Sequence, residues 1–141
     1  MDNFDVVVVP QHDSLNGNNV ISTKGAIHYL TIQEINENKS YLSNKVKSGK
    51  EIATLILGGP NKYYEYTKEN IENIFLKISE NFIKNDFQLI VVPSMRTPKD
   101  IIKFANKHYG KDHLVINEVD KKAYLSSLGL ADLIIVTCDS I

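Results

Sequence analysis

The sequence predicts an α/β fold, a doubly wound, Rossmann-like parallel sheet with helices on both faces. Two observations lead to this prediction. Short apolar runs along the chain are continuous rather than alternating, as is typical of strands covered on both faces. From residue 52 onward, strand and helix patterns alternate, and right-handed crossovers turn this order into a doubly wound sheet.

The expected strands are the apolar runs themselves. They are residues 5–10, 52–59, 89–94, 113–117 and 133–138. In the commonest doubly wound arrangement, strand 52–59 lies in the middle, the next two strands extend to one side, and the last strand lies on the other. The loops after Leu57 and Val136 then flank the topological switch point, where open α/β sheets bind ligands.

Helical patterns with defined starts separate these strands. Thr31 and Glu34 form a capping box at the start of residues 31–47, and Thr67 caps the segment 67–85. The second of these helices has one apolar face, formed by Ile71, Ile74, Phe75, Ile78 and Phe82.

Two further helices follow. For residues 97–110 the sequence predicts Thr97 as the cap, Pro98 as the first helical residue and Gly110 as the stop. A short helix is expected after Asp120. The chain ends directly after its last strand, so we expect a fragment of a larger architecture, truncated at its C-terminus.

Composition excludes several classes of function. The 141 residues suffice for one core, and a net charge of −1 gives no long-range attraction for nucleic acid. The single cysteine, Cys138, forms no internal disulfide and fits a reducing compartment. No signal peptide or membrane span is found, so we expect a cytoplasmic protein without an integral membrane segment.

The segment "GGPN" after the second strand is the first candidate site. Gly58 and Gly59 allow a ligand to approach the backbone, and their amide hydrogens are expected to point outward. Pro60, Asn61 and Lys62 complete the loop, and Lys62 could reach a phosphate. The pattern is neither GxGxxG nor a P-loop, and a tight turn with Lys62 in solvent is the alternative.

The segment "PSMRTP" is the second candidate. Ser94, Arg96 and Thr97 lie between a strand end and a helix N-terminus, where amide groups and the helix dipole attract anions. Alternatively, Thr97 only caps the helix and Arg96 forms a surface ion pair.

The last strand supplies the third candidate. Asp139 and Ser140 follow it at the expected switch point, where Ser140 could bond a phosphate and Asp139 could cap a helix. His12, in "PQHD", is a weak candidate for a general base, because Asp13 beside it on an extended chain need not orient it. The histidine spacing predicts no metal site.

Together, "VVVVPQHD", "LILGGPNKYY", "VVPSMRTP" and "LADLIIVTCDS" resemble the family named for the plant elongated-mitochondria fission protein. Many bacterial members of that family are regarded as candidate glycosyltransferases. The resemblance implies a glycosyltransferase-B-like fold, with residues 1–30 as the inter-domain connection that includes the last strand of an N-terminal domain. Residues 31–141 would be part of the C-terminal nucleotide-sugar lobe, with the nucleotide sugar as substrate and no cofactor.

The matched positions fix the expected donor site. Gly58, Gly59 and Pro60 match the family's glycine loop, and "SMRTP" and "DS" match its "PSRRTP" and "ADS" segments. Met95 stands where the family often has a second arginine, and Tyr124 alone remains of an Asn-Pro-Tyr-type segment, as a nucleotide-side candidate.

Three functions therefore stay open. The first is the donor-binding part of a glycosyltransferase, inactive as this fragment because transfer needs two lobes to close. The second is a non-catalytic interaction module related to fission factors, and the third is a nucleotide-binding regulatory domain unrelated to sugars. The chain could also be peripheral to the inner membrane, and the apolar strand 133–138 could form a homodimer through its exposed edge.

Overall fold

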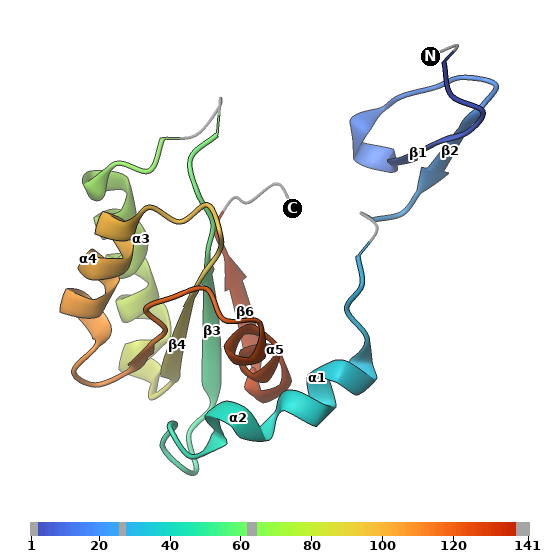
Figure 1. The fold of residues 1–141 in the computed structure, drawn as a ribbon. Coiled ribbons are helices and arrows are strands. Elements are labelled where there is room, and N and C mark those ends of the chain that lie inside the picture. Colours follow the sequence, from blue (N-terminus) through green and yellow to red (C-terminus); the bar gives the residue numbers. More distant parts are fainter. Residues whose placement is uncertain (1–2, 26–27, 62–64, 138–141) are drawn as a thin grey trace. The chain divides into compact units, whose positions relative to one another are not determined.

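The computed structural model describes residues 3–25, 28–61 and 65–137. Its contacts divide the chain into two compact units, residues 1–30 and 31–140. Each unit is described by itself (Figure 1).

The first unit contains two parallel strands, β1 (Val7–Pro10) and β2 (Val20–Thr23), joined through the 3-10 helix η1 (Gln11–Asp13). The Val7 amide donates to the Asn19 carbonyl at 2.8 Å, which fixes the register of the pair. The prediction for residues 5–10 is confirmed in part, whereas β2 was not predicted. Its four residues lie among polar residues and glycines, so no apolar run marks this strand.

The second unit is a four-stranded parallel sheet in the order β5-β4-β3-β6. The strands are β3 (Ile52–Leu57), β4 (Gln88–Pro93), β5 (Leu114–Val115) and β6 (Leu133–Val136). This order confirms the doubly wound arrangement, with β3 in the middle and β6 alone on one side. All residues of β3 and β4 are buried, as their continuous apolar runs predict.

Helices cover both faces of this sheet (Figure 1). On one face, α3 (Lys68–Asn81) and α4 (Lys99–Tyr109) pack against β3 and β4. The short 3-10 helix η2 (Ile83–Asn85) follows α3. On the other face lies α5 (Lys121–Leu130), with α1 (Ile32–Asn38) and α2 (Ser40–Ser43) packed against it.

The structure confirms Thr31 and Thr67 as side-chain caps of α1 and α3. Thr31 Oγ1 accepts from the Glu34 amide at 3.1 Å, and Thr67 Oγ1 accepts from the Asn70 amide at 3.2 Å. The Glu34 carboxylate lies 2.6 Å from the Lys121 ammonium, so this side chain ties α1 to α5. The predicted single segment 31–47 is two helices.

The start of α4 differs from the prediction. The helix begins at Lys99, Pro98 is its N-cap, and no side chain caps it. The Thr97 hydroxyl instead donates to the Leu57 carbonyl at 2.7 Å and accepts from the Ser94 amide at 2.8 Å. Thr97 is buried, and its hydroxyl bonds two backbone groups at the strand ends rather than the first turn of the helix. The stop at Gly110 is confirmed, although Gly110 keeps a right-handed conformation.

A histidine fixes the start of β4. His113 Nδ1 accepts from the Leu89 amide at 3.1 Å. Burial, with a smaller contribution from the Lys47 ammonium, lowers the His113 pKa from its ordinary 6.5. The folded state therefore binds this proton less readily than the unfolded chain. The contribution of neutral His113 to the free energy of unfolding is complete above pH 6.5. This contribution is lost as the pH falls below that value.

We expect the free energy of unfolding to fall when His113 is protonated, because a protonated Nδ1 cannot accept from Leu89. Between about pH 8 and 5 this loss is expected to reach about 1 kcal/mol. Urea titrations at several pH values, followed by an amide signal from β4, measure it. His113→Gln should lose this part of the pH dependence, while His12→Gln, at an exposed imidazole, should keep it. An unchanged pH dependence in His113→Gln contradicts the assignment.

The Thr97 contacts give a second test. Thr97→Val removes the hydroxyl but keeps the branched shape, so the Leu57 carbonyl loses a donor at a buried strand end. We expect a loss of about 0.5–1.5 kcal/mol in the free energy of unfolding, because the Leu57 carbonyl keeps the Ser94 amide as a donor. Thr97→Ser keeps the hydroxyl and serves as the control, with a smaller loss. Equal stability of Thr97→Val and wild type would show that the hydroxyl has no structural role.

Candidate anion-binding site at the carboxyl edge of the sheet

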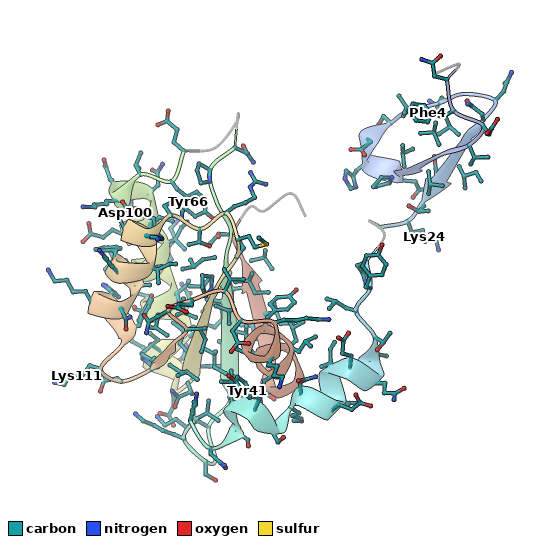
Figure 2. The ribbon with its side chains drawn as sticks, in the orientation of Figure 1. Phe4, Lys24, Tyr41, Tyr66, Asp100 and Lys111 are labelled. Carbon is teal, nitrogen blue, oxygen red and sulfur yellow. The ribbon has the colours of Figure 1, made fainter. Side chains whose placement is uncertain are left out.

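The carboxyl ends of β3, β4 and β6 meet at one edge of the sheet. Figure 2 shows this end of the second unit, with Tyr66 ahead of α3 and Asp100 in the first turn of α4; Lys111, after α4, lies at the opposite end. The register pairs Leu57 of β3 with Pro93 of β4 and Ile56 with Val136 of β6.

Two threonines bond the end of β3 from its two neighbours. On the β4 side, the Leu57 carbonyl accepts from the Thr97 hydroxyl and from the Ser94 amide, the latter at 2.9 Å. On the β6 side, the Gly58 amide donates to Thr137 Oγ1 at 2.9 Å. Thr97 and Thr137 are both buried, so these bonds lie inside the protein.

The Gly58 bond corrects one expectation. The Gly58 amide hydrogen does not point outward, because the Thr137 hydroxyl accepts it. No motif in the sequence indicates a role for Thr137 or for Tyr66, whose hydroxyl contacts Thr137 Oγ1. The only signal for Thr137 was its place near the end of the last apolar run. A contact between residues 71 positions apart leaves no local pattern.

Arg96 spans the loops that follow β3 and β4. Its Nη2 donates to the Pro60 carbonyl at 2.9 Å, and its backbone amide donates to Ser94 Oγ at 3.2 Å. Gly59 is buried and packs directly against Arg96. A β-carbon at position 59 would lie 2.3 Å from the Arg96 carbonyl oxygen. The structure thus brings Gly59, Pro60, Ser94, Arg96 and Thr97 together in one place.

The electrostatics of this place favour an anion. The Arg96 guanidinium is exposed, carries a permanent positive charge and has a planar set of donors that matches phosphate oxygens. It lies just ahead of α4, whose dipole is positive at this end. Met95, which precedes Arg96, is 89% exposed and faces solvent.

The other predicted residues lie elsewhere or outside the described chain. Asn61 follows Pro60 and is half-buried. Lys62, Asp139, Ser140 and the cysteine Cys138 lie outside the described residues. Tyr124 is in α5, packed against the cluster that contains Leu42 and Ile90, and burial raises the pKa of its hydroxyl.

His12 belongs to the first unit. It lies in η1, and its Nε2 is 3.6 Å from Asp13 Oδ1, with both side chains largely exposed. The assumption of an extended chain at this point is wrong, because residues 11–13 form a helical turn. Asp13 as a turn residue, the interpretation that the sequence favours over an orienting partner for His12, agrees with this turn.

In the described part of the chain, no group of three or more histidine, cysteine, aspartate or glutamate side chains could hold a metal ion. None of the helices found there is both long enough and apolar enough to cross a bilayer.

Comparisons with known proteins supply the family. No curated protein and no solved structure gives a match to the chain. The family model described as "Mitochondrial fission ELM1" matches residues 1–141, the whole of the sequence. This match agrees with the resemblance carried by the glycine loop, the "PSMRTP" segment and the "CDS" end. The chain belongs to the mitochondrial fission ELM1 family.

Proposed function

We propose that the second unit binds the diphosphate of a nucleotide sugar at the carboxyl edge of its sheet. The observation that carries this proposal is the position of Arg96, an exposed guanidinium held between the glycine loop and the N-terminus of α4. In this proposal the unit is the donor-binding part of a glycosyltransferase.

The chemistry of the loops supports an anionic ligand over a neutral one. A guanidinium binds two phosphate oxygens at once, and the charge-assisted bonds are about twice as strong as neutral ones. One acceptor of Arg96 Nη2 is the neutral carbonyl of Pro60, and a phosphate oxygen is by comparison a charged acceptor. The charged acceptor is the stronger of the two.

The remaining donor residues stay part of the proposal. Asn61 and Lys62 would continue the diphosphate contact from the glycine loop, and Asp139 and Ser140 would approach from the end of β6. Tyr124, on the face of the sheet that α5 covers, would lie on the nucleotide side. No metal or cofactor is invoked, and the proposed location is cytoplasmic or peripheral to the inner membrane.

Transfer itself requires more than this site. Glycosyl transfer needs donor and acceptor held in register in a space from which water is excluded. His12 is the only base candidate from the sequence, and it is exposed in the first unit. We therefore propose that this chain alone binds the donor without turnover.

The second candidate is a non-catalytic interaction module. β6 is one of the two edge strands of the described sheet, and two of its side chains, Ile134 and Val136, are 46% and 55% exposed. An apolar strand at a sheet edge favours association with another chain. Met95, in place of a second arginine, also favours this candidate.

An amide NMR titration with UDP, GDP, CDP and ADP tests the first candidate. We expect shifts at Gly59, Ser94 and Thr97, and an affinity about tenfold lower in Arg96→Ala, because a charge-assisted contact is lost. A preference for one diphosphate over ADP favours the sugar-nucleotide function over a general adenine-nucleotide domain. A folded protein whose spectrum is unchanged by all four ligands contradicts the proposal.

A substitution at Met95 that adds a positive charge provides a further test, and an uncharged substitution at the same position is its control. Met95→Arg adds a positive charge at an exposed position, so it should tighten binding about twofold to fivefold without changing stability. Met95→Gln, which adds no charge, should leave the affinity as it is.

Sedimentation at increasing protein concentration tests the edge strand. We expect a dimer that dissociates when Ile134→Lys places a charge on the exposed face of β6. Leu76→Lys, at an exposed position on α3, is the control and should leave association unchanged. A monomer at the highest concentration counts against dimerisation through this edge.

A further inference from the structure

Gly59 lies at the tightest point between two loops. A β-carbon added there would lie 2.3 Å from the Arg96 carbonyl oxygen, 2.6 Å from its Cβ and 2.7 Å from its carbonyl carbon. Distances under 3.0 Å do not occur for real β-carbons. Two of these three atoms are backbone, so no side-chain rotation relieves the contact.

A second contact between the two loops involves Pro60, the residue that follows Gly59. Arg96 reaches back over the glycine loop, and its Nη2 donates to the Pro60 carbonyl at 2.9 Å. The Arg96 amide is itself held by Ser94 Oγ. Both ends of Arg96 therefore contact the glycine loop. Its backbone packs against Gly59, and its guanidinium donates to the Pro60 carbonyl.

We propose that Gly59 is a positioning residue for Arg96. In the usual interpretation, a glycine in such a loop lets the ligand approach the backbone. Here, the space without a side chain is filled by the Arg96 backbone, so the glycine sets where the guanidinium stands. This inference rests on the proposed function, because it concerns how the diphosphate is recognised.

The alternative has a different consequence. If Gly59 served the ligand directly, a methyl group at position 59 would weaken binding whether or not the Arg96 side chain is present. If Gly59 acts through Arg96, the methyl group displaces the loop after β4, and its effect disappears once the guanidinium has been removed. A double-mutant cycle separates the two.

The experiment measures the affinity of the whole chain for inorganic pyrophosphate and for UDP. Four proteins form the cycle: wild type, Gly59→Ala, Arg96→Ala and the double variant. We expect Gly59→Ala to weaken binding about tenfold in the wild-type background and to have no further effect in Arg96→Ala. Gly25→Ala, where a β-carbon meets nothing within 4 Å, is the matched control and should bind as wild type.

Amide spectra without ligand provide a readout independent of binding. Gly59→Ala should shift the Ser94, Arg96 and Thr97 signals, and the Arg96 side-chain Nε–H signal should move as the Pro60 contact is lost. If no protein in the set binds pyrophosphate or UDP, the proposed function fails. The positioning role is then decided by these spectra alone.

Two results overturn the inference. One is an equal loss of affinity from Gly59→Ala in both backgrounds, and the other is an unmoved Arg96 signal in a folded Gly59→Ala protein. If Gly59→Ala does not fold, hydrogen exchange in the wild-type protein tests whether Gly59 and Arg96 are coupled. The Gly59 and Arg96 amides must then respond together to pyrophosphate, and independent responses contradict the coupling.

Discussion

The end of the central strand is the constraint on which the rest of the site depends. β3 is buried along its whole length, and the Leu57 carbonyl and Gly58 amide at its end are polar groups away from water. A buried backbone group without a partner costs about 1–3 kcal/mol. Hydroxyl groups from both neighbouring segments bond these groups: on the β4 side Thr97 donates to the Leu57 carbonyl, beside the Ser94 amide, and on the β6 side Thr137 accepts from the Gly58 amide.

These bonds also determine where the loop after β4 lies. Because Thr97 is bonded to Leu57 and Ser94, the loop after β4 is held close to the loop after β3, and Gly59 packs against the backbone of Arg96. In the proposed function, this packing positions the guanidinium. The proposed anion site therefore depends on a strand end whose buried polar groups are bonded.

The family match and the structure give different information about function. The match to the mitochondrial fission ELM1 family covers the whole chain. The structure adds an exposed arginine at a helix N-terminus and, at the other side of β3, an edge strand with two exposed apolar side chains. The first feature suits ligand binding and the second suits association, and both lie in the same unit.

The sequence by itself determined the sheet of the second unit. Continuous apolar runs marked β3, β4 and β6, alternation with amphipathic helices set the parallel order, and Thr31 and Thr67 marked helix starts, because all these signals are local. β2 was missed because its four residues carry no such signal, and η1 was missed because a single helical turn has no periodicity. Only the tertiary structure decided where the Thr97 hydroxyl points, what the Gly58 amide bonds and what fills the space above Gly59. Each of these depends on a partner 37 to 79 positions away in the chain, and the spacing of residues within one segment contains no information on such a partner.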